Sequence, residues 1–62
     1  PESQWREIAQ GLLNEPVQVG TTAGTVNGVI IEVGEDYMIL RETPGTILII
    51  PFQNVTSIQP IA

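Results

Sequence analysis

The chain has 62 residues, a formal net charge of −5 and neither cysteine nor histidine. It therefore holds one small domain without disulfides, and the missing ligand types argue against a zinc or iron site. Only Arg6 and Arg41 oppose seven acidic residues, which argues against binding to nucleic acid or anionic membranes, because both depend on Lys and Arg. Hydrophobic residues make up 42% of the chain, too many for a disordered acidic segment.

The apolar residues at the start of the chain recur at the spacing of one helical face, which holds Trp5, Ile8, Leu12 and Leu13. Residues 1–14 therefore predict a short amphipathic helix that docks this face on the rest of the domain, with Trp5 packed rather than free to anchor a partner. We expect Ser3 to be its N-cap. Asn14 ends the helix, and Pro16 prevents it from continuing.

Residues 16–59 predict five short β-strands. Their centres are the stretches 17–19, 29–33, 37–41, 46–50 and 55–58. In the second strand Val29, Ile31 and Val33 alternate, which places them on one face with Glu32 on the other.

Turns are expected at four places, namely 23–24, 34–36, 43–45 and 51–54. Pro44 and Gly45 suit the central positions of a type II turn. The dipeptide Asn27-Gly28 is also a hairpin signal and competes with a turn at Gly24. We favour the turn at Gly24 and interpret Gly28 as a bend within the second strand.

Four consecutive apolar residues, Ile47 to Ile50, distinguish the fourth strand. A strand alternates its side chains between two faces, so both faces of this strand must be covered. A chain of this length has little left to cover a second face, and an open apolar edge favours aggregation. The simplest cover is another copy of the chain, which predicts a homo-oligomer.

Three stretches resemble the Sm-like small barrel. Glu35 to Leu40 is similar to the acidic-x-aromatic-Met-Asn-apolar stretch that opens the third strand of that family. Ile50 to Ile58 resembles its Ile-Arg-Gly-x-x-Val-x-x-Ile stretch, and Gly24 to Gly28 its glycine-flanked second hairpin. Over nearly its whole length the chain is also similar to small DUF2642-type proteins of Bacillus-like bacteria.

The resemblance implies a mainly β fold, a single domain over residues 1–62. A short N-terminal helix (1–14) would precede a strongly bent, five-stranded antiparallel barrel of Sm-like or SH3-like type (16–59). It also implies a ring in which the fourth strand of one copy pairs with the fifth strand of the next. The corresponding interface residues here are Ile47, Leu48, Ile49, Ile50, Val55 and Ile58.

Sm proteins bind RNA, but the positions of their base pocket hold Ile39, Pro51 and Phe52 here. The amide, the guanidinium and the small residue of that pocket are missing, so nucleic-acid binding is not expected. The loops that carry ligand residues in Sm rings correspond to Asp36, Tyr37, Phe52, Gln53 and Asn54. The two aromatic rings could form a binding platform, but we favour packing roles for both.

Catalytic chemistry is not indicated. The Thr and Ser hydroxyls have no His or Lys to activate them, and Glu32, Glu35 and Asp36 are more typical of a solvated turn than of a calcium site. The absence of a membrane-length apolar run predicts a cytoplasmic protein, although the start at Pro1 indicates a processed N-terminus. We therefore expect a non-enzymatic, self-assembling scaffold or peptide-binding ring without cofactors. A divergent RNA-binding protein and a ring that binds a small ligand are the alternatives.

Overall fold

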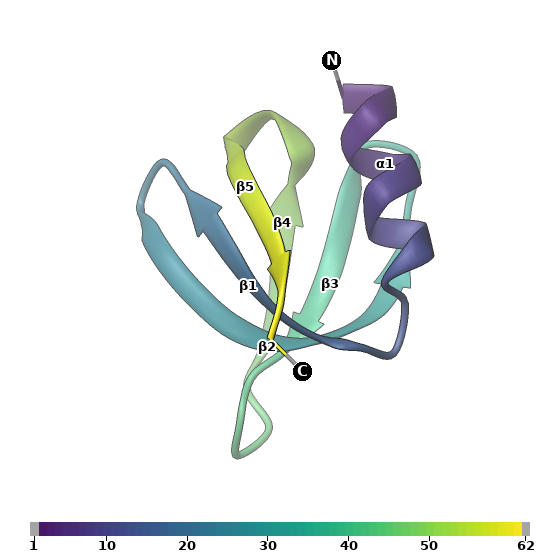
Figure 1. The fold of residues 1–62 in the computed structure, drawn as a ribbon. Helices are drawn as coiled ribbons and strands as arrows, with labels where there is room; N and C mark the ends of the chain where they lie inside the picture. The colour runs from purple at the N-terminus through teal and green to yellow at the C-terminus, as the bar shows by residue number, and fades with distance from the viewer. Residues whose placement is uncertain (1, 62) are drawn as a thin grey trace.

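The computed structural model describes residues 2–61, in which a helix, α1 (Glu2–Gly11), precedes one antiparallel sheet of five strands (Figure 1). The strands are β1 (Pro16–Thr21), β2 (Gly24–Val33), β3 (Tyr37–Arg41), β4 (Ile47–Pro51) and β5 (Val55–Pro60), with a 3-10 turn, η1 (Phe52–Asn54), before β5. The strand order is β4-β3-β2-β1-β5. The predicted mainly β fold is confirmed, but the sheet is not closed into a barrel, because β4 and β5 are its two ends and are not paired.

The helix has different ends from those predicted. It begins at Glu2, so Ser3 lies inside it and is not its N-cap. It ends at Gly11, and a turn leads to Asn14, which adopts a left-handed backbone with φ of 67°. The Asn14 N–H donates to the carbonyl of Ile30 at 2.7 Å, which ties the end of the helical segment to β2.

The left-handed conformation of Asn14 gives a testable prediction. Asn14→Ala should lower the free energy of unfolding by about 1 kcal/mol, because a Cβ without a compensating polar group is disfavoured there. Asn14→Gly should keep or slightly raise the stability, since glycine adopts positive φ without steric cost. Urea denaturation at one protein concentration compares the variants, and an equal loss in both would contradict this explanation.

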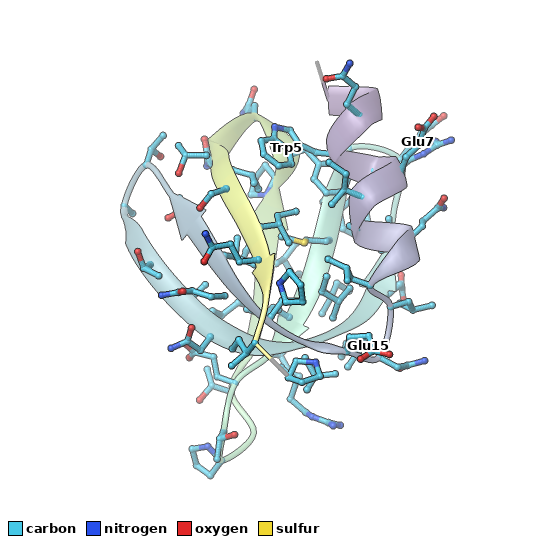
Figure 2. The ribbon with its side chains drawn as sticks, in the orientation of Figure 1. Trp5, Glu7 and Glu15 are labelled. Carbon is cyan, nitrogen blue, oxygen red and sulfur yellow. The ribbon has the colours of Figure 1, made fainter. Side chains whose placement is uncertain are left out.

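The helix docks through a face that differs by one position from the predicted face. Ala9 is fully buried, and Trp5 and Leu12 pack against the core, whereas Ile8 is 44% exposed. Figure 2 shows Trp5 turned toward the sheet and Glu7 pointing away from it. The predicted docking of Trp5 and Leu12 is confirmed. The placement of Ile8 and Leu13 in the docked face is wrong, since Leu13 is also 41% exposed.

Gly28 lies within a continuous ladder, as predicted. It is paired with Val17 of β1, while Thr21 pairs with Gly24 across the turn. A Cβ at Gly28 would lie 2.6 Å from the carbonyl oxygen of Arg41 in β3. The backbones therefore approach closely where β2 changes neighbours. The hairpin turn lies at Thr22 and Ala23, directly before Gly24, and not at Asn27-Gly28.

A β-bulge in β2 contradicts the predicted alternation of that strand. The pairing with β3 shifts register between Ile30 and Glu32, so Ile31 is an extra residue. Ile30 is fully buried, whereas Val29 and Ile31 are only partly buried. The predicted alternation placed Ile31 in the core instead of Ile30, because a strand without a bulge was assumed.

The remaining loops follow the predicted positions but not always the predicted geometry. The Thr43–Pro44 bond is cis and Gly45 has φ of 157°, whereas a type II turn has φ of about 80° at its second central residue. The predicted type II turn is therefore wrong. The loop projects from the body of the domain (Figure 1) and is closed by a hydrogen bond from the Glu42 N–H to the Thr46 carbonyl at 2.8 Å.

Candidate interaction surface at the open edges of the sheet

The two ends of the sheet, β4 and β5, are open edges. Within residues 2–61, β4 pairs only with β3 and β5 pairs only with β1. Every charged residue of the chain precedes Thr43, so neither edge strand carries a charge. Monomeric proteins usually protect an exposed edge with inward-pointing charges, lysine or bulges. The absence of a charge from both edges makes them competent for strand pairing.

The backbone of β4 presents hydrogen-bonding groups to its open side. Glu42 and Thr46 form a hydrogen-bonded pair that lies next to the first β3–β4 pair, Arg41 with Ile47. In an antiparallel ladder, hydrogen-bonded and non-hydrogen-bonded pairs alternate. The pair of Arg41 with Ile47 is therefore not hydrogen-bonded, and neither is the pair that contains Ile49. Ile47 and Ile49 therefore direct their N–H and C=O groups away from β3, toward the open edge.

The side chains of β4 divide between a covered and an uncovered face. Ile50 is buried and Leu48 is partly buried against the core. Ile47 and Ile49, on the outer face, are 50% and 66% exposed. The domain thus covers only one face of the four-residue apolar run.

A cavity of about 210 Å³ lies along the open edge of β4. It is lined by the β1–β2 turn (Thr21 to Ala23), by Val26, by residues 48–51 of β4 and by Asn54. Its lining is mostly apolar, so an incoming strand could place an aliphatic side chain there. A second cavity, of about 460 Å³, lies between β2 and the β3–β4 loop and is more polar.

The other edge strand, β5, presents a different surface. Val55 is 6% exposed and Ile58 packs partly against the core. Thr56, Ser57 and Gln59 are exposed. The two edges are therefore unlike each other: β4 is apolar on its outer face, whereas β5 is polar there.

The predicted ligand loops meet at one end of the sheet. The Phe52 N–H of η1 donates to the carbonyl of Asp36 at 3.0 Å, and the Asn54 carbonyl accepts from Thr22 at 3.0 Å. Phe52 is only 1% exposed, so its ring is part of the core and cannot serve as an exposed platform. Asp36 and Gln53 are exposed and Asn54 is partly buried.

Tyr37 also packs against the protein. Its ring covers Gly34, where an added Cβ would lie 2.3 Å from the ring carbons. Its hydroxyl donates a long hydrogen bond, 3.5 Å, to the carboxylate of Glu32. Neither aromatic ring of these loops is thus presented as a free stacking surface.

The outer face of β2, β3 and β4 brings together residues that were not recognised as a group in the sequence. Ile39 pairs with Ile49 on one side and with Glu32 on the other. In the neighbouring row, Arg41 pairs with Ile47 and with Val29. Met38 and Leu40 are fully buried, so the residues of these two rows point outward.

No three acidic side chains among residues 2–61 converge in a way that could hold a metal ion. None of the helical segments in that range has the length and apolar character needed to cross a membrane.

The sequence matches the model of a known protein family over nearly its whole length. Residues 2–60 match the model of a family described as "Domain of unknown function (DUF2642)". A search of curated proteins finds no match.

Proposed function

This chain belongs to the DUF2642 family, and we propose that it is a non-enzymatic module that assembles with copies of itself through its open edges. The observation that carries this proposal is the pair of uncharged edge strands, one of which exposes Ile47 and Ile49. Because β4 and β5 differ, pairing β4 of one copy with β5 of the next is heterologous. Such pairing continues until its rotation closes a ring, as the Sm-like resemblance also implies.

In such an assembly the cavity beside β4 would receive apolar side chains of the added strand. Ile58 of β5 is only partly buried in its own domain, which suits it to this contact. Pairing brings no like charges together, since neither edge strand is charged. The assembled ring would act as a scaffold or as a platform that binds a protein or peptide.

Sedimentation equilibrium of the unmodified chain tests the proposal directly. We expect a discrete oligomer at micromolar concentration, with a mass that is an integral multiple of 6.7 kDa. A well-folded monomer under these conditions would contradict self-assembly.

The alternative, a divergent RNA-binding protein, predicts a different result. Six copies would carry a formal charge of about −30, six times −5, which repels a polyanion. We therefore expect no binding of labelled oligo-U or oligo-A in a fluorescence anisotropy titration, even at low salt, where electrostatic attraction is greatest. Tight binding at physiological salt would instead favour the RNA-binding alternative.

A further inference from the structure

The first half of β2 has an open side within the sheet. β2 pairs with β1 from Gly24 to Val29, but it pairs with β3 only from Val29 to Val33. β3 ends at Arg41, and beyond it the chain continues into the projecting β3–β4 loop (Figure 1). The part of β2 that precedes Val29 therefore has a neighbouring strand on one side alone.

The open side of β2 presents the backbone groups of Thr25 and Asn27. The carbonyl of Ile30 accepts a hydrogen bond from the Asn14 N–H at 2.7 Å, so the backbone groups of Ile30 point to the side on which β1 lies. Backbone groups alternate between the two sides of a strand, so those of Thr25 and Asn27 point to the other side. β3 does not reach them there, and no loop within residues 2–61 bonds to them.

The cavity of about 460 Å³ lies along this open stretch of β2. Its walls are residues 25–29 of β2, Glu42 and Thr43 at the start of the β3–β4 loop, and Pro16 and Ile61. All of these residues belong to one copy of the domain, so the cavity does not depend on assembly. It borders two N–H and two C=O groups of a strand, which are the groups that an extended peptide uses when it adds to a sheet.

Charge selects among the segments that could add to this stretch. Glu42 is the one charged residue among those that line the cavity, and the whole chain carries a net charge of −5. A basic side chain on the added segment is attracted by both, whereas an acidic one is repelled. A second copy of this chain is a poor source of such a segment, because its basic residues, Arg6 and Arg41, lie in α1 and in the doubly paired strand β3.

We propose that the open stretch of β2 binds an extended peptide segment of another protein that carries a lysine or an arginine. Thr25 and Asn27 form backbone hydrogen bonds with the segment, as they would with a further strand, and its basic side chain pairs with Glu42. The segment lies between β2 and the β3–β4 loop. Such binding rests on the peptide-binding part of the proposed function, but it needs no oligomer, so either proposal can fail without the other.

Amide hydrogen exchange, followed by NMR, tests the site. In the free chain the amides of Thr25 and Asn27 should exchange faster than those of Val26 and Gly28, which bond to β1. The probe is a pentapeptide with a central lysine flanked on each side by valine and then threonine. Saturation with this lysine probe should slow exchange at Thr25 and Asn27 by about tenfold. Equal exchange of the four amides in the free chain, or no binding at about 1 mM probe, would overturn the proposal.

Matched charge variants test the role of Glu42. In a fluorescence anisotropy titration with labelled lysine probe, Glu42→Gln should weaken binding by about fivefold. Glu35→Gln removes the same charge from the exposed turn between β2 and β3, and it should have a smaller effect. A probe with glutamate in place of lysine should bind more weakly to the unmodified chain and regain affinity with Glu42→Gln. Equal losses in the two variants would show only general attraction to an acidic domain and would contradict the proposed pairing.

Proline substitutions separate this site from the open edge of β4. Asn27→Pro removes an N–H that the ladder with β1 does not use, so the domain should still fold while binding of the lysine probe is lost. Asn27→Ser keeps the N–H and should bind normally. Ile49→Pro should bind normally as well, and circular dichroism checks that each variant is folded. Loss of binding in Ile49→Pro but not in Asn27→Pro would place the peptide at the edge and overturn the proposal. If Asn27→Pro does not fold, amide exchange in the unmodified chain still decides.

Discussion

Alanine in place of Gly28 should destabilise the domain by about 2 kcal/mol or more, which corresponds to a drop in Tm of roughly 8 to 16 °C. The added Cβ would lie 2.6 Å from the carbonyl oxygen of Arg41 and 3.0 Å from Cγ of Leu40. The first neighbour is backbone within a paired strand, so it cannot move without breaking the β2–β3 ladder. Thermal denaturation at one fixed concentration measures the effect, and Gly28→Val should prevent folding.

Gly11→Ala is the matched control for this prediction. Gly11 is the last residue of α1, and a Cβ there would meet no atom within 4 Å. The same chemical change should therefore be neutral or slightly stabilising, since alanine favours the helix over glycine. Equal losses of stability in the two variants would show that close backbone approach is not the reason for glycine at position 28.

Proline in place of Ile49 should abolish the edge-joined assembly. The ladder directs the Ile49 N–H away from β3 and toward the open edge, so proline removes a donor that only another copy could use. Proline is tolerated in edge strands where the missing N–H faces outward, so the domain should still fold. Sedimentation equilibrium together with circular dichroism checks both parts of this expectation.

Ile49→Thr separates the backbone effect from the loss of the side chain. Threonine also removes the large apolar group but keeps the N–H and favours a strand. It should therefore weaken the assembly without abolishing strand pairing. If Ile49→Pro and Ile49→Thr dissociate the assembly to the same extent, the backbone of β4 does not form the joint.

Local sequence patterns predicted most of the secondary structure. The spacing of Trp5 and Leu12 indicated the helix, and the glycine and proline clusters placed the turns. The placement of Gly28 within a strand was also correct, although Asn27-Gly28 is a strong local turn signal. Pairing with β1 overrides that signal, because it satisfies the backbone along the whole of the β1–β2 ladder.

The errors in predicting buried residues arose where a shift of one position changes which side chains of a helix or strand face the core. Ala9 takes the buried place on α1 that was assigned to Ile8, which is 44% exposed. The bulge at Ile31 brings Ile30 into the core, and nothing in a single strand's sequence marks a bulge that depends on its partner. Either error shifts an element by one position without changing its type.

The same bulge explains how much of the candidate site could be predicted. The apolar run of β4 was visible in the sequence, and its exposed half lies on an open edge. The grouping of Glu32, Ile39 and Arg41 on one face could not be read from the sequence, because it depends on the register between β2 and β3 after the bulge. The edges were thus predictable from composition, whereas the grouping of residues on the outer face required the paired sheet.

The pairing of β5 with β1 has a consequence for how the chain folds. The other three strand pairs are hairpins between neighbours in sequence, but β5 pairs with β1, so that Val17 lies opposite Pro60. Closing a long loop costs more conformational entropy than closing a hairpin, and such distant contacts slow folding. Formation of the β5 edge is therefore the step that depends on overall topology, and the strand that supplies one joint of the proposed ring is entropically the most costly to place.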